Sequence, residues 1–175
     1  MIRIFSVLIF AFACSLAQSA FAGGYYGINY AQIDQDDRFF GGDTFSTGEV
    51  YGRLGGHINH YVAGEMRLGT TATPKEDTTL DTKFQNKRWY SLLARLQYPV
   101  SVFTPYLVGG YSSVTEQVSI GGTTANATFT TTSTLGAGID LTFKSWGINV
   151  EYLQLADEDN VSRKGPSAGI FFTFE

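Results

Sequence analysis

The stretch TLGAGIDLTFKSWGINVEYLQL, residues 134–155, decides the fold. Apolar side chains, most of them large, occupy every second position on both sides of Lys144-Ser145, while glycine and polar residues occupy most of the positions between them. A period of two places the two kinds of residue on opposite faces of a β-strand. The stretch therefore predicts two antiparallel strands joined by a tight turn, each with one apolar face and one face of small and polar residues.

The same alternation recurs along the chain from residue 25 onward. Eight segments show it, at residues 25–33, 49–58, 61–69, 88–98, 103–114, 131–143, 146–155 and 167–174. In the fifth segment the faces are ambiguous, because Tyr106 and Val108 compete with Leu107 and Tyr111 for the apolar side. Beyond the N-terminus no apolar stretch reaches the ~18 residues that a transmembrane helix needs, so strands must carry any membrane-spanning part.

The connections between these segments alternate in length. Those after the second, fourth and sixth segments are tight, at Asn59-His60, Pro99-Val100-Ser101 and Lys144-Ser145. The others are long and polar, at about residues 34–48, 70–87, 115–130 and 156–166. Transmembrane barrels have short periplasmic turns and longer extracellular loops. We therefore predict an all-β fold, an eight-stranded antiparallel up-and-down transmembrane β-barrel.

A soluble barrel with its apolar faces turned inward would show the same alternation. Three features favour the membrane. The polar faces are rich in glycine, serine and asparagine, which fit the narrow lumen of an eight-stranded barrel. The last strand alternates aromatic residues. Aromatic residues also end several apolar faces, as in the two aromatic girdles of membrane barrels, at Tyr26, Tyr90, Tyr98, Phe143, Trp146 and Phe174.

The N-terminus has the pattern of a secretory signal peptide. Arg3 precedes an apolar segment at residues 4–13, and Ala20-Phe21-Ala22 is an A-x-A cleavage site. We expect residues 1–22 to be the signal peptide and residues 23–175 to form the barrel domain. A competing interpretation makes Cys14 a lipidated cysteine, but residues 11–13 lack the leucine usual before such a site. With cleavage after Ala22 the mature chain has no cysteine and no disulfide.

Several motifs resemble those of small outer-membrane barrels of the OmpA-like, OmpX-like and opacity-type superfamily. They are residues 25–30 (YYGINY), 64–69 (GEMRLG), 104–110 (TPYLVGG) and 149–152 (NVEY), with the aromatic C-terminal strand. The resemblance implies a bacterial outer-membrane location, with membrane lipid, lipopolysaccharide and the barrel-assembly machinery as partners. Family members usually end in an aromatic residue, whereas this chain ends Phe174-Glu175.

Charged residues on the polar faces are the first candidate site. They lie about four to seven residues from the nearest tight turn, which places them in one layer of the lumen. We expect a buried ion-pair network of Arg53, Glu65, Arg67, Arg95, Asp140 and Glu151. Arginine suits such a network because its planar fork can hold two carboxylates. We favour a structural plug over a gate in a narrow pore, because side chains fill the lumen of small barrels.

Acidic residues in the first and last long loops are the second candidate site. They are Asp34, Asp36, Asp37, Asp157, Glu158 and Asp159. These loops become neighbours if the last strand closes on the first. Such carboxylates could hold Ca²⁺ or Mg²⁺ near lipopolysaccharide phosphates, but no EF-hand spacing is present. We therefore favour a solvated acidic rim.

The sequence predicts no enzyme, cofactor or metal centre. The two histidines, His57 and His60, both lie at the first tight turn, and ligands for a Cys/His metal site are lacking. The formal net charge of -4 gives no reason to expect a nucleic-acid partner. We expect a structural and surface-interaction role through the long loops. The alternatives are a narrow channel, a lipid A-modifying enzyme and a soluble periplasmic barrel.

Overall fold

The computed structural model describes residues 23–37, 44–73, 75–77, 82–120, 123–158 and 161–175. Its strands are β1 (Gly24–Asp37), β2 (Thr44–His57), β3 (Val62–Thr73), β4 (Lys75–Asp77), β5 (Thr82–Gln97), β6 (Phe103–Ile120), β7 (Thr123–Phe143), β8 (Trp146–Glu158) and β9 (Val161–Phe174). Among these residues no helix is long and apolar enough to cross a membrane.

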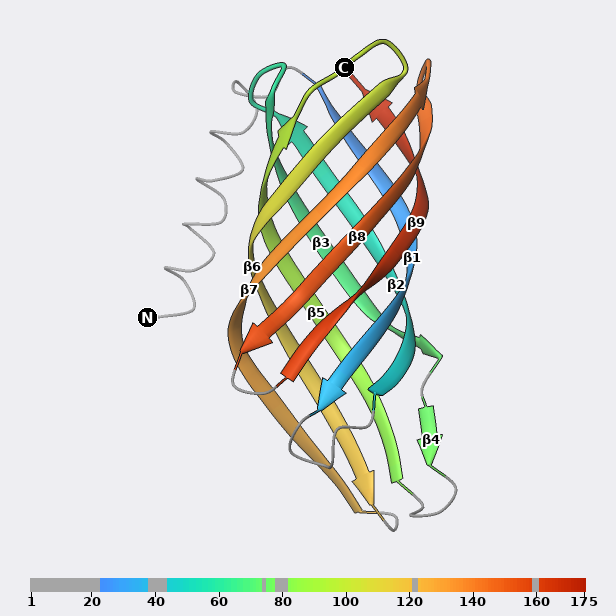
Figure 1. Ribbon diagram of the computed structural model, residues 1–175, viewed down its shortest axis with the longest axis vertical. Helices are drawn as coiled ribbons and strands as arrows, with labels where there is room; N and C mark the ends of the chain where they lie inside the picture. The colour runs from blue at the N-terminus through green and yellow to red at the C-terminus, as the bar shows by residue number, and fades with distance from the viewer. Residues whose placement is uncertain (1–22, 38–43, 74, 78–81, 121–122, 159–160) are drawn as a thin grey trace, which may run out of the picture.

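All strand pairs are antiparallel, and the sheet closes on itself. β1 pairs with β2 on one side and with β9 on the other. β3 and β4 both pair with β5, so β4 continues the line of β3. Counting β3 and β4 as one, the described residues form a closed eight-stranded up-and-down barrel, as the sequence predicted (Figure 1).

The register around the barrel is strongly staggered. From Gly24 the hydrogen-bonded partners run through Gly56, Gly64, Ala94, Gly109, Leu135, Gln154 and Lys164 and return to β1 at Asp34, a shift of ten residues. Such a stagger requires the strands to tilt relative to the barrel axis. Residues that lie at one height in the lumen are therefore not direct register partners.

The two faces of each strand point as the alternation predicted. Leu92 and Ile139 are 67% and 48% exposed on the outer wall, whereas Glu65 and Arg95 are 2% and 1% exposed inside the barrel. The ambiguous segment follows the same rule. Tyr106 and Val108 point inward, while Leu107 and Tyr111 point outward. An apolar outer wall around a polar lumen layer is the arrangement of a barrel immersed in lipid.

The three short turns lie at one end of the barrel, together with the C-terminus, and we call this the turn end (Figure 1). The opposite loop end carries the longer connections. Here the predicted loops were too long. β1 extends to Asp37 and β2 begins at Thr44, while β6 and β7 extend to Ile120 and Thr123. At these strand ends the sequence lacks a sustained alternation of large apolar residues, so the predicted segments ended too early.

Candidate functional site

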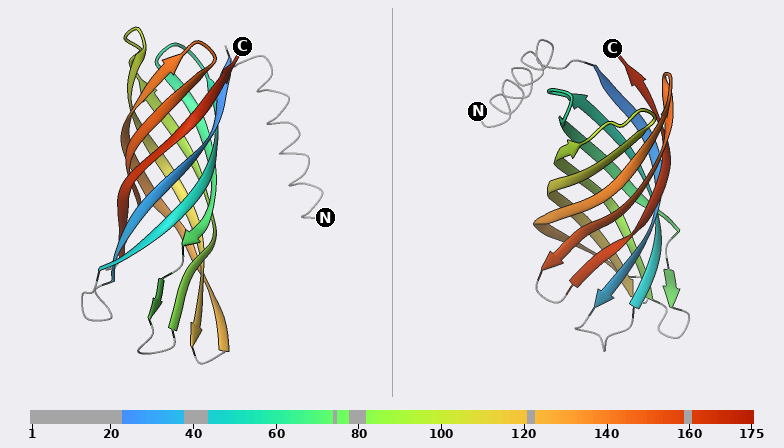
Figure 2. Two further views of the ribbon diagram at one scale, coloured as in Figure 1. Left: turned by 90° about the vertical axis from the view of Figure 1, so that its right-hand side faces the viewer. Right: turned by 45° about the horizontal axis from the view of Figure 1, so that its top comes forward.

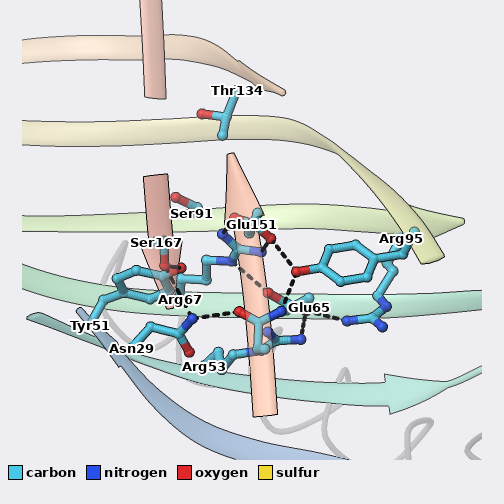
Figure 3. A network of polar contacts seen from close by, with 12 residues as sticks. Asn29, Tyr51, Arg53, Glu65, Arg67, Ser91, Arg95, Thr134, Glu151 and Ser167 are labelled. Atoms are coloured by element: carbon cyan, nitrogen blue, oxygen red, sulfur yellow. Dashed lines mark hydrogen bonds and ion pairs between the residues drawn. The ribbon is translucent and has the colours of Figure 1, made fainter. Parts of the chain in front are cut away.

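The six charged residues singled out in the sequence all point into the lumen. Each is at most 4% exposed, and together they come from β2, β3, β5, β7 and β8. Figure 3 labels Arg53, Glu65, Arg67, Arg95 and Glu151, whose guanidinium groups and carboxylates are turned toward one another. The structure thus brings Arg53, Glu65, Arg67, Arg95, Asp140 and Glu151 into one buried layer, which we call the charged layer.

Glu65 is the acceptor that three arginines share. Arg67 Nε donates to its Oε1 at 2.5 Å, and Arg53 Nη2 donates to its Oε2 at 3.2 Å. The Arg95 guanidinium lies 3.7 Å from the same Oε2, and the Tyr25 hydroxyl also donates to it. A carboxylate that is fully removed from water needs this many donors to remain charged.

Glu151 forms the second junction of the charged layer. Arg67 reaches it with both terminal nitrogens, Nη1 to Oε1 at 2.5 Å and Nη2 to Oε2 at 2.8 Å. The Tyr106 hydroxyl donates to Oε2 at 2.7 Å. Paired donors of this kind hold a carboxylate in a fixed orientation. Arg67 therefore bridges Glu65 and Glu151 and ties β3 to β8 through the lumen.

Asp140 forms the third junction. Arg95 Nη2 donates to its Oδ2 at 2.6 Å, and Asn149 Nδ2 donates to its Oδ1 at 2.8 Å. Arg53 Nη2 is 3.9 Å from Asp140 Oδ2 as well as close to Glu65. The three arginines balance the three carboxylates in formal charge, so the layer has no net formal charge of its own.

Aromatic rings complete the surroundings of the arginines. The Arg95 guanidinium carbon lies 3.7 Å from the centre of the Tyr106 ring and 5.2 Å from that of Tyr25. The Arg53 carbon lies 4.9 Å from the Tyr25 ring centre. Cations over ring faces are attracted by the ring quadrupole, more strongly where water is excluded. The rings thus stabilise those guanidinium nitrogens of Arg53 that have no hydrogen-bond partner among the described residues.

The sequence analysis missed the uncharged members of this network. Asn29 donates to Asn149 at 2.6 Å and to Ser167 at 3.2 Å, and the Tyr51 and Ser167 hydroxyls lie 2.7 Å apart. These residues occupy the same inward positions of their strands as the charged ones. The alternation of inward and outward positions along each strand could therefore have identified them, but only charged side chains were considered.

Close to Tyr106 the layer depends on a glycine. A Cβ atom placed on Gly138 would lie 2.5 Å from the Tyr106 hydroxyl oxygen and 2.6 Å from its ring. Real Cβ atoms do not approach other atoms so closely, so a larger residue at this position would displace the ring. The small residues of the lumen face thus leave the space that the large polar side chains fill.

On the loop-end side of the charged layer the lumen contains a buried apolar cluster, which the sequence analysis did not predict. The buried cluster there, which we call the apolar plug, consists of Ala31, Ile33, Tyr51, Trp89, Val114, Leu153 and Leu155. Trp89 is 1% exposed, and Ile33 and Leu153 are fully buried. Farther toward the loop end Arg163 Nη2 donates to Glu49 Oε1 at 2.7 Å. That second buried ion pair was also missed.

On the turn-end side the charged layer borders a cavity of about 490 Å³. Its lining includes Arg95, Asp140, Gln97 and both histidines. Gln97 accepts a hydrogen bond from Arg95 Nε at 2.9 Å, and its own amide nitrogen lies 3.2 Å from His57 Nδ1. The cavity at the turn end therefore reaches Arg95 and Asp140 of the charged layer.

The acidic residues of the second candidate site lie along strands β1 and β8. The register sets Asp36 and Asp157 on either side of Ser162, and Asp37 and Glu158 on either side of Val161. Asp34 accepts a hydrogen bond from the Ser46 hydroxyl, and Asp159 lies outside the described residues. In the described part of the chain, no three His, Cys, Asp or Glu residues gather as a metal site would require.

A closed antiparallel barrel with an apolar outer wall, an aromatic rim and a lumen filled by paired charges defines the class of outer-membrane β-barrel proteins. The comparison with known families agrees: residues 4–174 match the model of the outer membrane protein beta-barrel domain. The chain therefore belongs to that family.

Solved structures show the same fold. The chain is similar to neisserial surface protein A, with 16% identity, a TM-score of 0.66, and coverage of 86% of this chain and 97% of that one. It is also similar to Ail, the attachment invasion locus protein of Yersinia pestis, solved with the heparin analogue sucrose octasulfate. There the identity is 16%, the TM-score 0.64, and the coverage 86% and 99%. No curated protein matches the chain.

The N-terminal barrel domain of Pseudomonas aeruginosa OprF is a further neighbour, with 13% identity, a TM-score of 0.58, and coverage of 86% of this chain and 99% of that one. At these identities the structures share the fold alone. The turn end of this chain thus corresponds to the periplasmic side of an outer-membrane barrel, and the loop end to the cell surface.

Proposed function

We propose that this protein is a non-enzymatic barrel that supports the outer membrane and contacts external partners through its loop end. The observation that carries the proposal is the filled lumen. The charged layer and the apolar plug occupy successive levels of the barrel, and we infer that together they block a path for ions and small solutes. The parts of such a protein that other molecules can contact are its outer wall and its outer hairpins.

The filled lumen argues against the channel alternative. An ion crossing the barrel would have to separate Arg67 from Glu151 and then pass the Trp89 side chain, both of them buried. Breaking one buried ion pair by removing a partner costs about 3–5 kcal/mol. Because an ion would have to displace both layers, we expect the wild-type barrel not to conduct.

The outer hairpins support the surface role. β6 and β7 have 18 and 21 residues and project farther than the other strands at the loop end (Figure 2). Loops held on a rigid scaffold are common sites of recognition. Ail is named as an attachment invasion locus protein, and its complex contains the heparin analogue sucrose octasulfate. For this chain we propose a surface contact, with a partner that tolerates acidic strand ends.

The positions of the histidines support a non-enzymatic role. His57 ends β2 and His60 lies in the following turn, so both are at the turn end. Lipid A lies in the outer leaflet, at the opposite end of the barrel. Mass spectrometry of lipid A from cells with and without the protein tests this point. An altered lipid A profile that depends on the protein would contradict a non-enzymatic role.

Export to the outer membrane requires a processing step in this proposal. We propose that residues 1–22, which lie outside the described residues, are removed after Ala22 and that the assembly machinery then inserts residues 23–175. N-terminal sequencing of protein from purified outer membranes should give Gly23. Heat-modifiable migration on a detergent gel should accompany it. Recovery of the protein in the soluble fraction would favour the soluble periplasmic barrel instead.

Planar-bilayer recordings test the closed lumen directly. Purified wild-type protein should produce no reproducible single-channel steps, because both layers must open together. Reproducible steps that disappear when Arg53 or Glu65 is replaced would favour the channel and contradict the proposal.

The surface role is tested with cells that make either the intact protein or a variant lacking residues 117–126 of the β6–β7 hairpin. Adherence to serum-coated surfaces and to one another is compared at equal outer-membrane levels of folded barrel. The intact protein should adhere better. Equal adherence of the two strains would count against a surface role for this hairpin.

A further inference from the structure

A series of hydrogen bonds connects a histidine of the turn-end cavity to the charged layer. Asp140 Oδ2 accepts from Arg95 Nη2 at 2.6 Å, and Gln97 Oε1 accepts from Arg95 Nε at 2.9 Å. The amide nitrogen of Gln97 lies 3.2 Å from His57 Nδ1 and 3.3 Å from the backbone oxygen of His60. We call His57, Gln97 and Arg95, which all line the cavity, the turn-end network.

The neighbours of Gln97 fix the orientation of its amide. The Nε–H of an arginine can only donate, so the Gln97 atom beside Arg95 must be the oxygen. A backbone carbonyl can only accept, so the Gln97 atom beside the His60 oxygen must be the nitrogen. Both contacts select the same orientation. The Gln97 nitrogen therefore donates to His57 Nδ1.

This orientation determines the protonation state of His57. A ring nitrogen that accepts a hydrogen bond carries no proton, so Nδ1 is unprotonated. The ring must then carry its single proton on the other nitrogen, because the hydrogen bond made by one ring nitrogen sets the state of the other. In this arrangement His57 is the neutral Nε2–H tautomer.

A second proton on His57 conflicts with the turn-end network. Protonated histidine is a donor at both ring nitrogens, so Nδ1–H would face the Gln97 amide hydrogens. Turning the amide by half a rotation would remove this conflict. The amide nitrogen would then face Arg95 Nε–H, and the amide oxygen would face the His60 carbonyl, so both of these hydrogen bonds would be lost. Protonation of His57 is therefore coupled to the contact between Gln97 and Arg95.

The charged and titratable groups around His57 give its protonated form no carboxylate partner of its own. They are Tyr25 on β1, Arg95 on β5, Asp140 on β7 and His60 in the following turn. Of these groups only Asp140 is negative, and it already accepts from Arg95. Cleavage after Ala22 would add an ammonium group at Gly23, whose carbonyl oxygen accepts from His57 N at 3.0 Å. That group would add a further positive charge near the ring.

From this geometry we propose that the turn-end network is a pH-sensitive switch at the periplasmic end of the barrel. At neutral pH the neutral His57 ring holds Gln97 in the orientation that binds Arg95 Nε. In acid the half-buried His57 takes up a proton, the Gln97 amide turns, and Arg95 Nε loses its acceptor. Arg95 keeps its hydrogen bond to Asp140, so the charged layer stays paired while its periplasmic side is rearranged.

Nuclear magnetic resonance of the ¹⁵N-labelled barrel in detergent micelles tests the switch. Long-range ¹H–¹⁵N correlations distinguish the two neutral tautomers of a histidine ring. The chain has two histidines, so His60→Gln, which keeps the backbone carbonyl, leaves only the His57 ring signal. At neutral pH we expect the Nε2–H tautomer. On acidification the Arg95 Nε–H signal should shift with the same midpoint as the His57 ring, whereas that of Arg163 near the loop end should not.

Substitutions at Gln97 test the coupling. Gln97→Glu can accept from both Arg95 Nε and His57 Nδ1–H, so protonated His57 should persist to a pH higher by about one unit or more. Gln97→Leu can neither donate nor accept, so His57 should titrate without a shift of the Arg95 signal. Asn59→Asp is the matched control. It adds the same charge to the same cavity and keeps the side-chain oxygen that accepts from the turn, and it should move the His57 midpoint less than Gln97→Glu does.

Four results would overturn the proposal. They are an Nδ1–H tautomer at neutral pH, a wild-type Arg95 signal that does not move while His57 titrates, equal His57 midpoints in Gln97→Glu and wild type, and a His57 ring that stays neutral until the barrel unfolds. Folding of each variant is checked by heat-modifiable migration. If Gln97→Glu does not fold, Gln97→Leu decides the coupling, and an Arg95 signal that still follows His57 in that variant would contradict the proposal.

Discussion

Arg67 on β3 and Glu151 on β8 form a two-pronged ion pair through the middle of the barrel, with N–O distances of 2.5 and 2.8 Å. These strands are not neighbours in the sheet. Backbone hydrogen bonds hold only adjacent strands together, so this pair adds a connection across the lumen.

Removal of one partner should destabilise the barrel strongly. Glu151→Ala leaves the Arg67 fork buried and half-paired, and we expect a loss of about 3–5 kcal/mol in the free energy of unfolding. Urea unfolding in lipid vesicles, followed by tryptophan fluorescence, measures it. Lys164→Gln, an exposed change, serves as the control and should shift stability by less than about 0.5 kcal/mol. A Glu151→Ala barrel as stable as wild type would show that the pair contributes nothing.

The double variant Arg67→Met/Glu151→Met should recover much of that loss. Well-packed apolar side chains of similar size often replace buried ion pairs without a penalty. In this barrel Glu65 loses one of its donors in the double variant, so we expect recovery to be partial. The same unfolding measurement checks it. If the double variant loses as much stability as the two single variants together, the side chains do not interact directly.

The two lumen layers should act as independent barriers to ions. Trp89→Ala opens space in the apolar plug but leaves the charged layer intact, so conductance should stay at the level of the lipid bilayer alone. Opening should require a second change in the charged layer, such as Trp89→Ala/Arg67→Ala. Single-channel recording of both variants tests this. Steps in Trp89→Ala alone would show that the charged layer does not seal the lumen.

Gly138→Val should damage the charged layer without touching a charge. The added side chain would occupy the space of the Tyr106 ring, which then loses its 2.7 Å hydrogen bond to Glu151. We expect a loss of about 1–3 kcal/mol, the usual cost of overpacking a filled interior. Gly64→Val is a suitable control, since nothing lies within 4 Å of a Cβ atom at that position. Equal effects of the two substitutions would rule out the steric explanation.

The loop end should not bind sulfated polyanions. The strand ends there carry Asp36, Asp37, Asp157 and Glu158 close together along the backbone. Like charges repel, and a sulfated ligand would need basic residues in their place. Titration calorimetry with sucrose octasulfate at low salt should give no heat of binding. Measurable binding would mean that the acidic ends are not part of the contact surface.

The sequence predicted the fold well because its signal is local. A period of two fixes which face of each strand is apolar, and alternating connection lengths fix the antiparallel order. The charged layer could also be predicted, from the face of the strand on which each charged residue lies and from its distance to the nearest tight turn. Glu65 and Arg95, for example, point inward as expected. The strand ends at the loop end could not be predicted in this way, because the alternation of apolar and polar residues fades there.

By itself, then, the sequence determined the number of strands, their faces and the inward placement of the six charged residues. The tertiary structure decided which of those residues meet. The ten-residue stagger of the register and the resulting tilt bring Arg67 to Glu151 and Arg95 to Asp140 across the lumen. It also gathers Ile33, Trp89 and Leu153 into the apolar plug. Periodicity along one strand carries no information about the height at which another strand crosses the barrel, because closure of the whole sheet sets that height.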